Sequence, residues 1–153
     1  MAATLVETTV RTSLLATFFI RDAMFALDAA HVQEVIRAAS VTRIRHAPEA
    51  VAGVINLRGK IVTLLDTGLI LGFGQTAIGP ESRILIVDGK GEFIGMLVDR
   101  VGEVIEVEPH ALDPVPANLP PAQTRFFQGL YRSGGRVTAL LNSGELTGEA
   151  RRS

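Results

Sequence analysis

The sequence predicts an all-β fold with a few short helices, built from two small barrel-like subdomains that share a core. Two observations on this chain of 153 residues lead to the prediction. Short apolar segments rich in β-branched residues recur along the chain, separated by glycine-containing turns, which is the pattern of β-hairpins. The second half of the chain also resembles the first half, so each half is expected to form the same small sheet.

The internal repeat is clearest between residues 53–72, GVINLRGKIVTLLDTGLILG, and residues 129–148, GLYRSGGRVTALLNSGELTG. Aligned without gaps at an offset of 76, the two segments share six of twenty residues, four of which are glycines. Upstream, VQEVI at 32–36 matches VGEVI at 101–105. A sheet of about four or five short strands buries its apolar face by curling into a barrel or by packing on its twin.

The first half is predicted to hold two hairpins joined by a helix and a strand. The hairpins have tight turns at Asp22-Ala23 and at Arg58-Gly59. Asp28 is a suitable N-cap for a short helix, because apolar residues follow it at helical spacing. The alternating segment VTRIRH is expected to be a strand. The predicted elements are Ala16–Arg21, Met24–Leu27, the helix within 28–36, the strand at 41–46, Val51–Leu57 and Lys60–Asp66.

The second half is predicted to hold two more hairpins, a long irregular connection and a closing helix. Five of the seven prolines fall in residues 109–124, which is incompatible with regular structure. Apolar residues recur in that segment, so we expect a packed surface loop. The predicted elements are a loop at 73–82, strands at Arg83–Asp88, Glu92–Val98 and Val101–Glu108, a hairpin of Phe126–Tyr131 and Arg136–Asn142 around Ser133-Gly134-Gly135, and a helix near 143–148.

The chain is expected to be one domain with two short tails. Residues 1–15 lack a clear period and are interpreted as an N-terminal tail, and residues 149–153 as a C-terminal tail. Between them, residues 16–148 form two subdomains of about 18–72 and 85–148, and strand exchange between them is left open. Glu7 and Arg11 interrupt the only stretch that could serve as a signal peptide. No apolar run approaches the length of a membrane span, so direct membrane insertion is not expected.

Composition excludes several classes of protein. Fifteen basic and sixteen acidic residues give a net charge of −1, so no positive excess exists for nucleic-acid binding. The absence of cysteine excludes disulfides, thiolate nucleophiles and iron–sulfur clusters. The apolar residues AVILMFWYC make up 47%, and the 15 glycines raise the fraction to about 57%, above the roughly 45–50% of an average globular chain, which indicates surface kept for partners.

The sequence contains no assembled catalytic or metal-binding motif. His31, His46 and His110 lie at no metal-ligand spacing, and the chain lacks a G-x-S-x-G nucleophile motif and a P-loop. Three aspartates, at positions 66, 88 and 99, end predicted strands, where turn and cap chemistry explains them. We therefore expect no enzymatic activity, no metal and no cofactor.

The segment GVINLRGKIVTLLD, with VQEVIRAASVTRIRHAPEAV before it and GMLVDRVGEVIEVEP after it, resembles the CheW family of chemotaxis coupling proteins and the related domain of the kinase CheA. The resemblance covers about residues 16–148. The family usually has proline at the position of Thr63, aspartate at that of Asn142 and an aspartate-leucine pair at Asp66-Thr67. These departures affect which branch of the family is meant.

The resemblance implies two five-stranded SH3-like barrels around a common core and a function without catalysis. Such adaptors link the cytoplasmic tips of methyl-accepting receptors to a CheA-type histidine kinase. The protein is then expected in the cytoplasm, recruited to membrane-associated receptor arrays. A CheW-like adaptor for another array, serving surface motility, pili or second-messenger control, is the alternative, and an enzyme or small-molecule-binding barrel is a distant third.

The resemblance also implies particular contact residues. Arg58 at a hairpin turn could donate charge-assisted hydrogen bonds to a receptor carboxylate or helix carbonyls, or it could simply be a solvated turn residue. Structural roles are equally open for the other positions, as core residues or as glycines required by the backbone. The receptor-facing set is Val32, Glu34, Gly53, Arg58 and Gly95, and the nominated kinase contacts are Ile44, Leu64 and Leu71.

Overall fold

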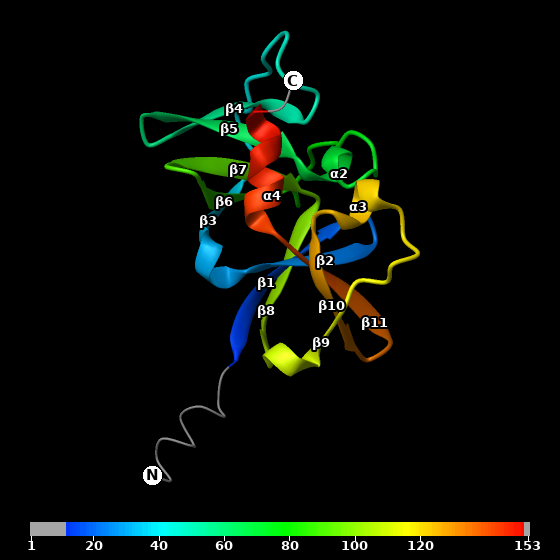
Figure 1. The fold of residues 1–153 in the computed structure, drawn as a ribbon. Helices are drawn as coiled ribbons and strands as arrows, with labels where there is room; N and C mark the ends of the chain where they lie inside the picture. Colours follow the sequence, from blue (N-terminus) through cyan, green and yellow to red (C-terminus); the bar gives the residue numbers. More distant parts are fainter. Residues whose placement is uncertain (1–11, 152–153) are drawn as a thin grey trace.

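The protein forms two β-sheets in a computed structural model that describes residues 12–151 (Figure 1). The helices are short, so the predicted all-β class with a few short helices is confirmed. The elements are β1 (Ser13–Ile20), β2 (Ala23–Asp28), η1 (Ala29–His31), β3 (Val32–Arg37), β4 (Val51–Leu57), β5 (Lys60–Asp66), α2 (Thr67–Ile70), β6 (Arg83–Gly89), β7 (Glu92–Val98), β8 (Arg100–Val107), η2 (Pro109–Ala111), β9 (Leu112–Asp113), α3 (Pro121–Thr124), β10 (Phe127–Ser133), β11 (Arg136–Leu141), α4 (Ser143–Thr147) and η3 (Gly148–Arg151).

The two sheets have the same internal order. Sheet A runs β8-β1-β2-β11-β10-β9, and sheet B runs β3-β6-β7-β5-β4. Each contains one parallel pair, β2 with β11 in sheet A and β7 with β5 in sheet B, among antiparallel pairs. The sequence repeat relates β1 to β6, β2 to β7, β3 to β8, β4 to β10 and β5 to β11. Each sheet therefore combines the first hairpin of one copy with the remaining strands of the other.

The repeat also extends to the irregularities of the sheets. In the β4–β5 hairpin the register shifts between Val51 and Gly53, and in the β10–β11 hairpin it shifts between Phe127 and Gly129. These positions differ by 76, the offset of the repeat. A β-bulge bends its strand and increases the local twist. Both hairpins are thus bent at the same place.

The bulge glycines allow the chain to cross close to each hairpin. After β3 the chain returns and Thr42 pairs with Val54, and after β8 it returns as β9, where Asp113 pairs with Leu130. A Cβ built at Gly53 would lie 2.3 Å from the carbonyl oxygen of Thr42, and one at Gly129 would lie 3.1 Å from that of Asp113. These crossings bring the two edges of each sheet together, which is the closure expected of a small barrel.

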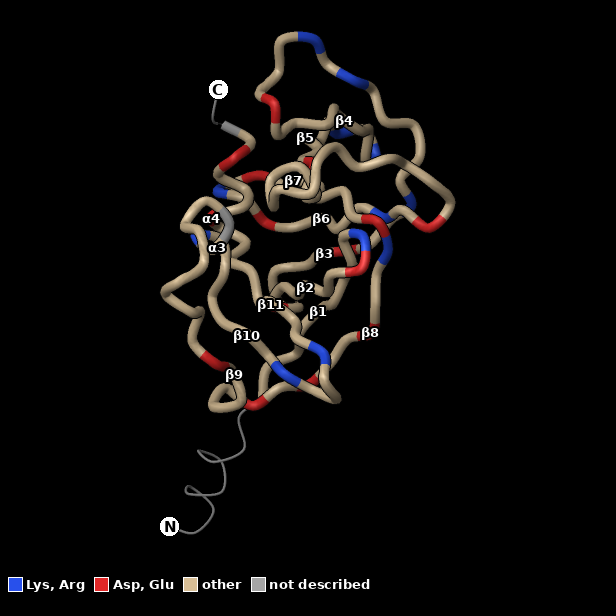
Figure 2. Tube along the Cα trace, turned by 90° about the vertical axis from the view of Figure 1, so that its right-hand side faces the viewer, with Lys and Arg blue, Asp and Glu red and all other residues tan. Residues whose placement is uncertain are grey.

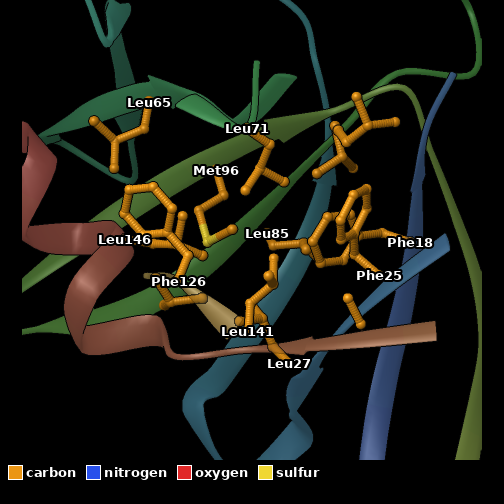
Figure 3. Close-up of a cluster of buried hydrophobic side chains, with 14 of the residues drawn as sticks. Phe18, Phe25, Leu27, Leu65, Leu71, Leu85, Met96, Phe126, Leu141 and Leu146 are labelled. Atoms are coloured by element: carbon orange, nitrogen blue, oxygen red, sulfur yellow. The ribbon is translucent and has the colours of Figure 1, made fainter. Parts of the chain in front are cut away.

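Three clusters of buried side chains correspond to this arrangement. One cluster fills sheet B, one fills sheet A, and the largest lies between the sheets. Figure 3 shows side chains from both sheets, with Leu146 of α4, converging in the largest cluster. Their burial stabilises the fold by the removal of apolar surface from water. The two sheets therefore share one core.

Equivalent caps start the two short helices that follow β5 and β11. Asp66 Oδ1 accepts a hydrogen bond from the Leu69 amide at 3.1 Å, and Asn142 Oδ1 accepts one from the Glu145 amide at 3.1 Å. An amide oxygen is therefore sufficient at Asn142, where the family usually has aspartate. The helix near 143–148 was predicted, whereas α2 was not, although Asp66 ahead of an apolar segment was its signal.

Two polar side chains hold the loop at 73–82, which was correctly predicted to be irregular. The buried carboxylate of Asp66 accepts hydrogen bonds from the Thr76 amide at 2.9 Å and the Thr76 hydroxyl at 2.6 Å. Arg21 donates to the carbonyl oxygens of Phe73, Gly74 and Gln75 and forms an ion pair with Asp99 at 3.0 Å. The loop is consequently fixed to both sheets.

Two predicted elements are wrong. Residues 28–36 were expected to form a helix, but only Ala29–His31 is helical, and Val32–Arg37 forms β3. The apolar residues of that segment are β-branched and pair with β6, so the tertiary contact overrides the local cap signal. Residues 41–46 were expected to form a strand, but only Thr42 makes a bridge. Ser40 and His46, at the two ends of the segment, have φ values of +56° and +63°, so the backbone leaves the extended conformation at both ends.

The remaining boundaries agree with the predicted hairpins or shift by a few residues. β1 begins at Ser13, inside the segment interpreted as a tail, and residues 1–11 lie outside the described residues. The proline-rich segment 109–124 is irregular apart from η2, β9 and α3. The division into subdomains at 18–72 and 85–148 stays a prediction.

Replacing Gly53 by alanine tests the crossing. We expect Gly53→Ala to lower the free energy of unfolding by about 2–4 kcal/mol, because the new methyl group meets backbone that cannot move away. Gly79→Ala is the matched control, since a Cβ there has no atom within 4 Å, and it should change stability by less than about 0.5 kcal/mol. Urea unfolding measures both, and equal effects would contradict the role given to Gly53.

Candidate functional site

The candidate site is the turn between β4 and β5, where Arg58 stands at the tip. Arg58 has a φ of +50° and Gly59 one of +85°, which are the positive values of a two-residue type I′ turn. The Asn56 side-chain oxygen accepts a hydrogen bond from the Gly59 amide at 2.9 Å. The turn is therefore well defined, although only glycine adopts such backbone conformations without strain.

The guanidinium of Arg58 reaches Glu34 of β3, 24 residues earlier in the chain. Its Nη1 donates to Glu34 Oε1 at 3.2 Å, and its Nη2 forms the second branch of the contact with Oε2. Such a bidentate pair has defined geometry as well as charge. Because β3 and β4 are the two terminal strands of sheet B, the pair connects the edges of that sheet.

The ion pair changes the acid–base properties of both groups. Hydrogen bonds from Arg58, aided by its positive charge, hold the pKa of Glu34 below its ordinary value, and loss of hydration acts in the opposite direction. The same contact raises the pKa of Arg58. The Arg58 side chain nevertheless keeps 69% of its surface exposed, so its remaining N–H groups are available to a partner.

The second copy of the repeat has no such pair. The position equivalent to Arg58 is Gly134, which has a φ of +57° in the same kind of turn. Glycine fits this conformation, whereas arginine is strained there. Sheet A also closes without the pair. The fold alone therefore does not explain why arginine occupies position 58.

The other residues expected to face the receptor have mainly structural surroundings. Val32 is half-buried and packs against the core cluster between the sheets. Gly53 lies at the bulge described above. Gly95 lies in β7, where a Cβ would meet the side chains of Ile84 at 2.9 Å and Leu64 at 3.1 Å. Of the five positions, only Glu34 and Arg58 contact each other through polar groups.

Two of the three nominated kinase contacts need correction. Leu64 is completely buried in the cluster that fills sheet B, and Leu71 is buried between the sheets. Their side chains belong to the core and cannot contact another protein without unfolding, because Leu64 points inward from β5 and Leu71 packs inward directly after α2. Ile44 differs, since 48% of it is exposed in the loop between β3 and β4.

A groove with a volume of about 610 Å³ lies between the tips of the β4–β5 and β6–β7 hairpins. Lys60, Ile61 and Phe93 are among its lining residues, and Ile61 and Phe93 are exposed. The sequence analysis missed these two residues. The signal was the alternation after the turn at Arg58-Gly59, in which Val62 and Leu64 face the core and Ile61 faces away.

Neither a metal site nor a membrane span is found in the described part of the chain. Residues 12–151 contain no group of three His, Asp or Glu side chains that could hold a metal ion. Within the same residues, no helix has the length and apolarity needed to cross a membrane. Arg58 places an exposed cation at a position fixed by Glu34, near a groove that is lined by charged and polar residues as well as by Ile61 and Phe93.

The pKa of Glu34 tests the ion pair in solution. We expect the Glu34 carboxyl to titrate below the ordinary value of about 4.3 and to return toward that value in Arg58→Gln. Since the folded-state pKa is lowered, the pair stabilises the fold above the ordinary value, and this contribution is lost as the pH falls through the lowered pKa. Carbon-13 NMR titration of the Glu34 carboxyl measures its pKa in the wild type and in Arg58→Gln. The same pKa in both proteins would rule out the pairing.

The chain matches the family model described as "CheW-like domain" over residues 15–151. Among curated proteins, it is 27% identical to chemotaxis protein CheW of Helicobacter pylori, over 84% of this chain and 78% of that protein. It is 32% identical to CheW of Klebsiella aerogenes, over 77% and 71%. Protein FrzA of Myxococcus xanthus is 30% identical, over 88% and 84%.

Among solved structures, the scaffolding protein TtCheW from Thermoanaerobacter tengcongensis matches with a TM-score of 0.81. The sequence identity is 30%, and the match covers 90% of this chain and 88% of that one. The family model spans nearly all of the described residues, including both sheets and the turn that carries Arg58. The chain belongs to the CheW-like domain family.

Proposed function

We propose that this protein is a non-catalytic chemotaxis adaptor that couples methyl-accepting receptors to a CheA-type histidine kinase. The match to CheW proteins and to a CheW scaffolding protein over almost the whole chain supports a scaffolding role in chemotaxis. The observation that supports the receptor contact is the state of Arg58, which is exposed and held in place by Glu34. Its backbone is in a strained conformation that Gly134, its counterpart in the repeat, adopts without strain.

The chemistry of Arg58 suits a receptor tip made of helices. A guanidinium has five N–H donors, and Glu34 accepts from two of the guanidinium nitrogens. The remaining donors can bond a carboxylate or the last carbonyls of a helix, while Ile61 and Phe93 offer apolar surface beside them. In this proposal Glu34 orients Arg58, Val32 contributes apolar packing, and Gly53 and Gly95 act through the backbone.

For the kinase contact, the proposal keeps only Ile44 of the three nominated residues. Ile44 is exposed and belongs to the loop between β3 and β4, and this loop lies at the end of the molecule away from β9 (Figure 1). Burial of this exposed apolar side chain against the kinase would favour the contact. The adaptor would act in the cytoplasm, at arrays of membrane receptors.

A CheW-like adaptor in a different array is the second candidate. The relatives include FrzA of Myxococcus xanthus, which carries a different name from the other relatives described above. A tagged protein recovered from native lysate distinguishes the two, since the pathway is named by the kinase and receptors that mass spectrometry finds with it. Recovery of neither from a folded bait would contradict both candidates.

Arg58→Glu is expected to weaken receptor binding by at least tenfold while leaving the fold intact. The substitution replaces a donor by a like charge beside Glu34 and beside any receptor carboxylate. Arg132→Glu is the matched control, because Arg132 is equally exposed, with 68% of its side chain accessible, and is also paired with a carboxylate, Asp113. Biolayer interferometry with an immobilised receptor-tip fragment gives the affinities, and circular dichroism checks the fold.

The double variant Glu34→Arg with Arg58→Glu separates two explanations. It restores an ion pair between β3 and the β4–β5 turn, but the positive charge now lies on β3 and the negative charge on the turn. If Arg58 itself contacts the receptor, binding stays weak. Recovery of wild-type affinity would show that only the pair matters and would contradict the contact role of Arg58.

A further inference from the structure

Two neighbouring strands of sheet B, β5 and β7, separate before they reach the tips of their hairpins. β5 begins at Lys60 and β7 at Glu92, but their parallel ladder begins only at Thr63 and Ile94. The groove of about 610 Å³ lies at this separation, and all its lining residues come from the β4–β5 and β6–β7 hairpins. Figure 1 shows the two hairpins with their tips at the left, and Figure 2 shows the charged residues along the chain.

Backbone groups that a sheet normally pairs face this groove. In a hairpin with a two-residue turn, the residues that flank the turn bond to each other, and the next residue points its N–H and C=O away from the partner strand. In β5 that next residue is Ile61, because Leu57 and Lys60 flank the turn. No strand within residues 12–151 pairs with this side of Ile61. The groove therefore offers one donor and one acceptor to an added strand.

The repeat places a second groove at the same position of sheet A. It has a volume of about 520 Å³ and is lined by the first residues of β2 and β11 among others. There the parallel ladder begins at Met24 and Thr138. The counterpart of Thr138 is Val62, which lies one residue before the ladder of sheet B. Sheet B therefore leaves one more residue of each strand unpaired at this end.

A segment of the chain itself lies at the groove of sheet A. Leu119, from the proline-rich segment between β9 and α3, lines that groove together with residues of β2, β10 and β11. The connection between β3 and β4, residues 38–50, is shorter than its counterpart 108–126 and contributes nothing to the lining of the groove in sheet B. Within the described part of the chain, sheet B thus lacks the apolar segment that sheet A has.

The two grooves also differ in charge. The strand registers make Ala23 and Phe19 of sheet A the counterparts of Glu92 and Asp88 of sheet B. The lysine that starts β5 has an arginine as its counterpart, so the difference between the copies is negative. Asp88 accepts a hydrogen bond from neutral Gln33 at 2.7 Å, and no other described residue forms an ion pair with it. A positively charged occupant complements this groove.

We propose that the groove of sheet B binds an extended segment of another protein, which pairs with β5 at Ile61. The segment carries apolar side chains, as Leu119 does in sheet A, and a basic side chain that faces Asp88. In strand addition, main-chain hydrogen bonds provide the affinity and alternate side chains provide the specificity. Only a few residues take part, so we expect a Kd between about 10 μM and 1 mM. Arg58 is not needed for this binding, which goes beyond receptor coupling and is tested separately.

A phage-displayed library of random peptides is the probe, selected on the wild type after depletion on Ile61→Pro. Proline removes the N–H that faces the groove and has no partner strand, so the fold should be retained, and a melting curve checks it. We expect the surviving peptides to combine β-branched apolar residues with Lys or Arg. As synthetic peptides they should bind Ile61→Pro at least about tenfold more weakly than the wild type in fluorescence polarisation.

Matched variants separate strand addition from other effects. Val137→Pro makes the same change at the counterpart position in sheet A and should bind the peptides like the wild type. Ile61→Ala keeps the N–H and should lose less affinity than Ile61→Pro, whereas Asp88→Lys should weaken binding at least about fivefold. Hydrogen exchange of the Ile61 amide should slow when a peptide binds, and that of the Val137 amide should not.

Three results would overturn the inference. They are a library from which no peptide survives the depletion, equal losses of affinity in Ile61→Pro and Val137→Pro, and unchanged exchange of the Ile61 amide in the presence of a bound peptide. If Ile61→Pro loses its fold, Asp88→Lys takes its place in the depletion. The exchange of the Ile61 amide then decides the outcome in the wild-type protein.

Discussion

The exchange of the first hairpin between the two copies is the constraint on which the rest of the structure depends. Because β1–β2 lies in the sheet of the second copy and β6–β7 in that of the first, neither copy completes a sheet by itself. The parallel pairs β2–β11 and β5–β7 join the copies, and the largest apolar cluster lies between the sheets. The position of the β4–β5 turn, and hence of Arg58, consequently depends on residues from both halves of the chain.

Sequence patterns correctly predicted elements that depend on neighbouring residues. They failed where contacts between residues far apart in the chain determine the secondary structure. The hairpin at Arg58-Gly59 was predicted with both strands, since the alternating strands and the turn glycine all lie within residues 51–66. Residues 28–36 were predicted to be a helix because Asp28 is a good cap, but Val32–Arg37 forms β3, whose partner strand β6 lies about fifty residues away. The buried Leu64 and Leu71 were misassigned for a different reason: the hairpin was recognised, but the inward face of β5 and the packing of Leu71 after α2 were not.

The sequence predicted which residues make up the candidate site but not how they are arranged in space. Glu34 and Arg58 were both named by resemblance, yet nothing in their spacing places them together, because the closure of sheet B brings β3 to β4. Gly53 shows the opposite case. A structural role for this glycine was left open by the sequence, and the structure supports it, because a Cβ at Gly53 would lie 2.3 Å from the carbonyl oxygen of Thr42. The expected set thus contains one polar pair, which we propose binds the receptor, and two glycines whose close surroundings leave no room for a side chain.

An internal repeat provides a control for separating structural from functional residues. Where the copies agree, as at Gly53 and Gly129 or at the caps Asp66 and Asn142, the same backbone geometry demands the same chemistry. Where they differ, the shared fold cannot be the reason. Arg58 against Gly134 is such a difference, and there the fold would prefer the glycine. We propose that receptor binding is the reason for a strained arginine on one copy of a turn that the other copy makes without strain.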